Sequence, residues 1–150
     1  PTWYAGLVKA PLNPPGWIFG PVWTTLYFLL GVSLYLVWSH NWKIVNPLLA
    51  NKRRTWNRWS EQLWSGKLQT LNIIAIFSVQ YILNIFWSIV FFNWHSPMMA
   101  FFVIVALWVS ILYTMVNFYR VSKTAAWLLL PYLLWVSFAA YLNFAVWRLN

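Results

Sequence analysis

Side chains that could carry out chemistry are few in this chain, and they set the first limits on its function. Acid-base and nucleophilic catalysis usually needs a carboxylate, a histidine or a cysteine held beside a partner. The sequence has one carboxylate, Glu61, two histidines, His40 and His95, and no cysteine. It therefore predicts no metal site and no catalytic group of this kind, and it excludes disulfides and thiolate centres.

The other polar candidates are neutral amides placed among aromatic side chains. Indole rings offer flat apolar faces with one N–H donor, and a small alanine lets a neighbour or a ligand approach closely. The pattern favours a cleft for a large, planar and mostly apolar molecule. The alternative is that amides and small residues only join helices, with indoles at the membrane interfaces. Three sets share a helix face through three- or four-residue steps: Trp23 with Tyr27, Gln80 with Asn84, Trp87 and Ser88, and Trp135 with Ala139 and Asn143.

The charged residues are concentrated in a few short stretches. Between these stretches lie three long blocks that contain no charged residue. These blocks cover residues 10–42, 68–119 and 124–147. A helix needs about 20 apolar residues to cross the hydrocarbon core, so the first and third blocks hold one span each and the second holds two. Lipid offers the backbone no hydrogen bonds, so each span must be helical. The sequence predicts an all-α membrane protein, a transmembrane helix bundle with four spans in a single domain of residues 1–150.

Prolines, glycines and polar residues divide the chain into spans and connections. The spans are predicted at residues 17–38, 70–92, 98–119 and 125–147. The prolines and glycines of residues 1–16 predict a lid loop. Residues 39–69 are predicted as a basic, tryptophan-rich loop, either interfacial or simply solvated. Ser96 can cap the third span, with Pro97 at its first position.

The lysines and arginines lie beside the predicted spans and orient them. Eight of the ten fall in the connections after the first and third spans, whereas Lys9 and Arg148 lie on the other side. For a protein of an inner membrane, the positive-inside rule then places the 39–69 loop in the cytoplasm. A net charge of +9 arranged in this way suits the lipid bilayer, so no nucleic-acid partner is predicted. His40 and His95 fall at opposite faces of the bundle and cannot share one ligand.

The same residues also resemble a known family. The chain is similar over nearly its whole length, apart from residues 39–68, to the tryptophan-rich sensory protein / translocator protein (TspO/MBR) family. The family motifs are matched in the right order by Trp3-Tyr4, Lys9, Pro14-Pro15, Phe19-Gly20-Pro21-Val22-Trp23, Leu26-Tyr27, Gln80, Leu83-Asn84, Trp87-Ser88, residues 126–135 (AWLLLPYLLW) and Tyr141-Leu142-Asn143.

This resemblance implies a fold, partners and a site. Members are five-helix, commonly dimeric proteins of bacterial membranes or the mitochondrial outer membrane that bind porphyrins and other tetrapyrroles. It therefore implies a first helix before Pro1, a homodimer, and a tetrapyrrole such as a porphyrin or haem as ligand, with no obligatory cofactor. Lys9 is the candidate partner of ligand carboxylates. By motif match, the pocket would be lined by Trp23, Asn84, Trp135 and Ala139, and its rim would be shaped by Pro14 and Pro15. The candidate ligand-binding residues also include Lys9, Tyr27 and Trp87.

Three positions depart from the family pattern. Leu12 stands where members often have tryptophan, and the 39–69 loop is longer than usual. The cholesterol-associated pattern near the end of the last helix is incomplete, because Phe144 stands between Leu142 and Arg148 where a tyrosine is required. Such patterns are weak evidence even when complete. A sterol partner is therefore disfavoured, and a sterol-binding or lipid-binding transporter-like protein is kept as an alternative.

Three functions remain open at this point. The first is tetrapyrrole binding, with the ring stacked on Trp23 and Trp135. The second is an enzyme that degrades porphyrin photochemically or oxidatively, with Trp23 or Trp135 as the reactive group. The third is sensing or transport of the tetrapyrrole. The spans have no charged relay and no internal repeat, which argues against active pumping. We expect a binding protein rather than an enzyme.

Overall fold

The computed structural model describes residues 2–50 and 56–150, with side chains for residues 3, 5–40 and 72–150. Every regular element in the described chain is helical. The elements are α1 (Thr2–Gly6), the 3-10 turn η1 (Gly16–Ile18), α2 (Phe19–Ala50), α3 (Trp56–Phe92), α4 (Pro97–Val121), α5 (Lys123–Trp127) and α6 (Leu130–Leu149).

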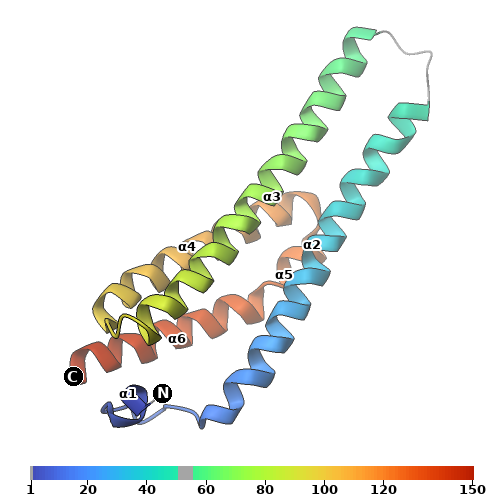
Figure 1. The fold of residues 1–150 in the computed structure, drawn as a ribbon. Helices are drawn as coiled ribbons and strands as arrows, with labels where there is room; N and C mark the ends of the chain where they lie inside the picture. The colour runs from blue at the N-terminus through green and yellow to red at the C-terminus, as the bar shows by residue number, and fades with distance from the viewer. Residues whose placement is uncertain (1, 51–55) are drawn as a thin grey trace.

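The helices form an antiparallel bundle. Figure 1 shows α2 and α3 side by side as a long hairpin, with α4 and α6 packed along one part of it and both chain ends at one end of the bundle. Four segments are long and apolar enough to cross a membrane, which confirms the predicted number of spans. These segments are Gly16–His40, Asn72–Phe92, Pro97–Val121 and Lys123–Leu149.

The first difference from prediction concerns residues 39–69. Helix α2 continues to Ala50 and α3 begins at Trp56, so the prediction of a loop across this stretch is wrong. Lysine, arginine, glutamine and leucine are good helix formers in water as well as in lipid. Their polarity marks where a helix leaves the apolar layer, not where it ends. The predicted interfacial role of the tryptophans falls on side chains that lie outside the described residues.

The last predicted span is divided into two helices. Helix α5 ends at Trp127, Leu128 and Leu129 form a turn, and α6 starts at Leu130. Pro131 lies in the first turn of α6, where its missing N–H is tolerated, but a helix continuing from α5 would need that N–H for the carbonyl four residues earlier, at Trp127. The proline therefore starts a new helix within the span; the predicted span at 125–147 is confirmed as the segment Lys123–Leu149, and its division into α5 and α6 was not predicted.

The connections between spans follow the prediction in outline. Pro97 is the first residue of α4, as expected, but Ser96 makes no side-chain capping bond. Ser122, before α5, does cap: its oxygen accepts a hydrogen bond from the backbone N–H of Ala125 at 3.3 Å. Within the predicted lid, residues 2–6 form the single helical turn α1, and the chain is irregular from residue 8 to 15.

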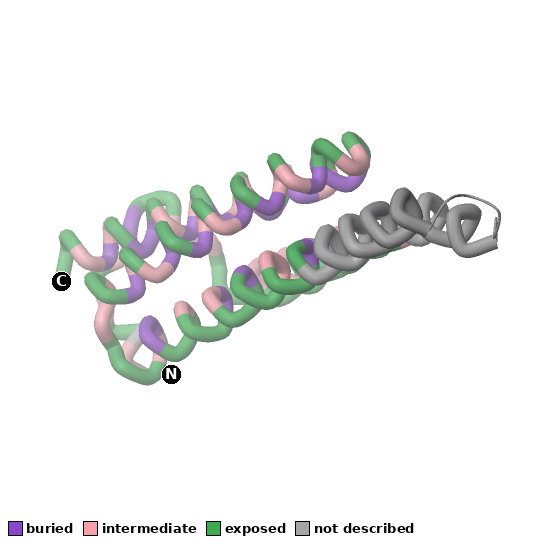
Figure 2. Tube along the Cα trace, turned by 90° about the horizontal axis from the view of Figure 1, so that it is seen from above, coloured by how far each residue is buried: buried purple, intermediate pink, exposed green. Residues whose placement is uncertain are grey.

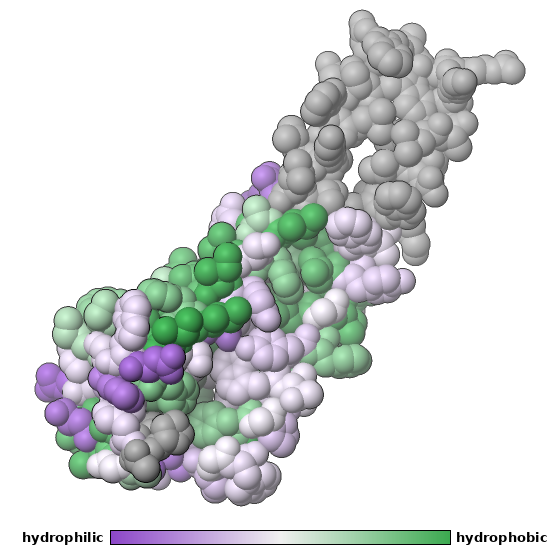
Figure 3. All heavy atoms as spheres, in the orientation of Figure 1, coloured by the Kyte–Doolittle hydropathy of each residue, from purple (hydrophilic) through white to green (hydrophobic). Residues whose placement is uncertain are grey.

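The core lies where α2, α3, α4, α5 and α6 meet. Its side chains include the fully buried Val37, Ile111, Leu129 and Val136. Figure 2 shows buried positions on the inward faces of the helices and exposed positions on the outward faces. Many exposed side chains are large and apolar, such as Phe28 on α2. Figure 3 shows apolar surface along the bundle and hydrophilic atoms near the end that holds the termini. Large apolar side chains on the outer surface, in addition to those in the core, fit helices surrounded by lipid.

Candidate functional site

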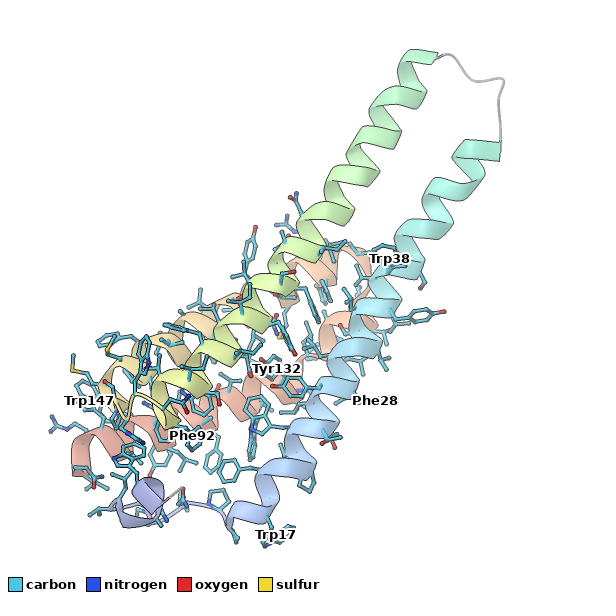
Figure 4. All side chains as sticks on the ribbon, viewed as in Figure 1. Trp17, Phe28, Trp38, Phe92, Tyr132 and Trp147 are labelled. Atoms are coloured by element: carbon cyan, nitrogen blue, oxygen red, sulfur yellow. The ribbon has the colours of Figure 1, made fainter. Side chains whose placement is uncertain are left out.

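A cavity of about 370 Å³ opens between the start of α2 and the second halves of α3 and α6. Helices α2 and α3 contribute mainly aromatic walls, and α6 contributes smaller side chains. In Figure 4, Phe92 and Tyr132 lie between helices, whereas Phe28 and Trp38 lie on the outside of α2 and Trp17 is exposed in η1 just before it. The cavity is lined by Gly16, Phe19, Trp23, Trp87, Phe91, Phe92, Ala139, Leu142, Asn143 and Val146.

Helical spacing brings the lining residues to one place. On α3, Trp87 and Phe91 are one turn apart, and their rings stack with centroids 5.6 Å apart. On α6, Ala139 and Asn143 are also one turn apart, so both face the cavity. The sequence predicted Trp23, Trp87 and Ala139 for the site, and the structure brings these three together around one space.

The amide that reaches the cavity is that of Asn143. Its Nδ2 donates to the carbonyl oxygen of Pro97 at 2.7 Å, and its Oδ1 accepts from the indole N–H of Trp87 at 3.4 Å. The side chain is buried. These contacts fix the amide and the Trp87 ring together. Sequence reasoning placed Asn143 on the correct face but left it out of the predicted site, although its four-residue step from Ala139 was the available signal.

Asn84, which was predicted for the site, is held by two tyrosines instead of lining the cavity. Its Oδ1 accepts from the Tyr27 hydroxyl at 2.8 Å, and its Nδ2 donates to the Tyr132 hydroxyl at 3.1 Å. One amide thereby connects α2, α3 and α6. The ring of Tyr27 stacks on Trp23 with centroids 5.5 Å apart, so this polar tie supports a cavity wall from behind. Ligand contact by Asn84 and Tyr27 stays a prediction.

Trp135 stands behind the cavity rather than among its lining residues. Its ring meets Phe19 edge to face at 5.8 Å, and Phe19 does line the cavity. The Trp135 indole N–H is buried and has no hydrogen-bond partner in the described part of the chain. Ligand contact by Trp135 therefore stays a prediction.

The N-terminal segment passes across the end of the bundle beside the cavity. Trp3 packs on Phe91 with centroids 5.8 Å apart and on His95 at 4.5 Å. The Val8 backbone N–H donates to Asn150 Oδ1 at 3.0 Å, and Asn150 Nδ2 donates to the Val8 carbonyl at 3.1 Å. This pair of bonds, which we call the Val8–Asn150 clasp, fastens the segment to the end of α6.

The predicted rim residues lie in this same segment. Pro14 and Pro15 precede Gly16, which lines the cavity, and the N–H of Ile18 donates to the Pro15 carbonyl at 3.1 Å. Lys9 is partly buried next to the clasp. The three residues are close in the chain to the cavity but do not belong to its lining, so their predicted contacts with a ligand remain predictions.

Among the described residues, no group of three or more histidine, cysteine, aspartate or glutamate side chains could hold a metal ion. The chemistry available at the cavity is therefore that of its own walls. Those walls offer aromatic faces, aliphatic carbon and the fixed amide of Asn143. Such a site can bind and orient an apolar ring, but its lining has no group suited to proton transfer or nucleophilic attack.

Fold and site together define a multi-pass helical membrane protein with an aromatic cavity inside its bundle. Comparison with known proteins gives the family. Residues 1–148 match the TspO/MBR family, and the chain belongs to it.

Its relatives come from distant organisms. The chain is 40% identical over 149 residues to the Tryptophan-rich protein TspO of Chlorobaculum tepidum, covering 99% of this chain and 79% of that protein. It is 33% identical to the human Translocator protein, covering 99% and 75%. It is 32% identical to the Tryptophan-rich sensory protein of Cereibacter sphaeroides, covering 99% and 77%. The chain is thus an integral, multi-pass membrane protein of this family.

Proposed function

We propose that the protein binds a tetrapyrrole in the aromatic cavity between α2, α3 and α6. The observation that carries the proposal is the set of walls around that space: the aromatic rings of Trp23 from α2 and of Trp87 and Phe91 from α3, with small Ala139 from α6. A flat macrocycle gains most from aromatic faces, where stacking adds to apolar burial. The family resemblance supports the same ligand class.

The cavity has the volume of a ligand pocket, and its polarity suits a mostly apolar ligand. At about 370 Å³ it lies within the range of roughly 300–1,000 Å³ that is usual for ligand pockets, which are mostly apolar with a few placed polar groups. Asn143 supplies such a group, because its amide is already held by Pro97 and Trp87. Charged propionates cannot be buried in these walls without a partner, so they should lie towards the segment that carries Lys9.

Enlarging one side chain in the cavity wall tests the proposal. Ala139→Leu fills the cavity and should weaken binding of protoporphyrin IX by at least tenfold, measured by quenching of tryptophan fluorescence in detergent. The matched control is Ala140→Leu, since the neighbouring Ala140 lines a separate groove between α4 and α6. Equal affinity of the two variants would contradict binding in this cavity.

A further inference from the structure

The C-terminal end of α4 carries a groove that the tetrapyrrole proposal does not use. It is a space of about 340 Å³ between α4 and α5. Leu112, Met115 and Val116 form its apolar length, and Arg120 closes one end. Leu112 and Arg120 are eight residues apart, so the groove runs about 12 Å along the helix from the apolar layer towards the turn.

The polar end of the groove is lined by one cation, and a second lies beside one of its aromatic rings. Arg120 is exposed, and the ammonium of Lys123 lies 5.7 Å from the ring centroid of Tyr119, which also lines the groove. This cation–π contact keeps Lys123 beside the groove rather than extended into water. Trp127 completes the rim and is exposed, a placement typical of indoles at headgroup depth. The groove is therefore apolar at one end and cationic at the other.

The chain has too few acidic side chains to neutralise its cations. Glu61 is the only acidic side chain in the sequence, against ten lysines and arginines. The positive-inside rule places this end of the bundle in the cytoplasm, where anionic lipids are concentrated. A molecule that carries both an apolar chain and a phosphate complements both ends of the groove.

We propose that this groove, lined by Leu112, Met115, Val116, Tyr119, Arg120 and Trp127, binds one anionic phospholipid. One acyl chain lies along Leu112, Met115 and Val116, and the phosphate meets Arg120 and Lys123. The site is separate from the aromatic cavity and does not rest on the proposed function.

The test compares lipids and matched variants by native mass spectrometry of the detergent-purified chain. The probes are dioleoylphosphatidylglycerol and dioleoylphosphatidylcholine, which share acyl chains and differ in net charge. The wild type should retain one phosphatidylglycerol per chain in preference to phosphatidylcholine. Arg120→Gln should weaken this retention about fivefold, as expected for the loss of one cation near an anionic headgroup. The control Arg148→Gln removes an equal charge from the other end of the bundle and should leave retention unchanged.

A second pair of variants tests the apolar half of the site without changing charge. Val116→Phe narrows the groove and should lower phosphatidylglycerol retention, whereas Val109→Phe, two turns away on α4 and outside the groove, should not. Both valines are about half exposed, so neither change should prevent folding. The proposal is overturned if Arg148→Gln weakens retention as much as Arg120→Gln, because retention would then reflect net charge alone. It is also overturned if Val116→Phe has no effect, or if soluble glycerol phosphate displaces the lipid.

Discussion

At the scale of single residues, two similar amides in this bundle have different roles. Asn84 joins two tyrosine hydroxyls and supports the wall formed by Trp23, whereas Asn143 reaches the cavity itself. The sequence placed both on helix faces with aromatic neighbours. It could not distinguish them, because the partners that occupy Asn84 come from α2 and α6, 57 and 48 residues away along the chain.

The first prediction at this scale concerns the tie through Asn84. Asn84→Leu leaves the hydroxyls of Tyr27 and Tyr132 without their shared partner, and it should lower the free energy of unfolding by about 1–2 kcal/mol. The measurement is an unfolding titration with sodium dodecyl sulfate in mixed micelles. Asn117→Leu is the control, since the Asn117 amide donates to the Tyr113 carbonyl of its own helix. Similar losses in the two variants would show that the tie between helices is not what stabilises the bundle.

At the scale of elements, a single hydroxyl fastens α5 to α2. The Ser33 hydroxyl, fully buried, donates to the Ala125 carbonyl at 2.7 Å. The division of the last span into α5 and α6 makes this contact important, because a helix of five residues has little stability of its own. Proline at 131 was visible in the sequence as a signal for this division. The serine partner was not, since nothing local to Ser33 indicates a carbonyl 92 residues away.

Ser33→Ala should therefore loosen α5 selectively. We expect a loss of about 1 kcal/mol in the free energy of unfolding, and faster hydrogen exchange of amides in residues 123–127. The matched control is Ser39→Ala on the same helix, because the Ser39 hydroxyl donates within α2 to the Leu36 carbonyl. The interpretation fails if exchange of residues 123–127 is unchanged in Ser33→Ala or rises equally in the control.

At the scale of the whole molecule, the order and number of spans could be predicted because charge interrupts the chain only at their ends. The lengths of the helices could not be predicted in the same way, since α2 and α3 continue as helices beyond the apolar blocks. The cavity was predicted as a meeting of faces from separate spans, and it lies between α2, α3 and α6. Its exact lining depended on how far each helix rotates about its axis, which packing decides rather than local spacing.

The Val8–Asn150 clasp connects the two ends of the described chain and gives the last prediction. Asn150→Ala removes both hydrogen bonds to Val8, so the amide of Val8 should exchange with solvent about fivefold faster. Leu149→Ala is the control, because Leu149 is half exposed and precedes the clasp without forming it. The measurement is hydrogen–deuterium exchange followed by mass spectrometry. An unchanged rate at Val8 would mean that other contacts hold the segment in place.

The neutral character of the interhelical hydrogen bonds has an electrical consequence. Tyr27, Asn84, Trp87, Thr114 and Gln80 form their bonds between helices without any net charge. A membrane potential of 100 mV acts on one elementary charge with about 2.3 kcal/mol, but it exerts no such force on uncharged groups. The voltage across the bilayer should therefore leave the packing of the spans undisturbed. Any voltage dependence of binding to this protein would have to originate in the ionic state of the guest or in the cations at the ends of the helices.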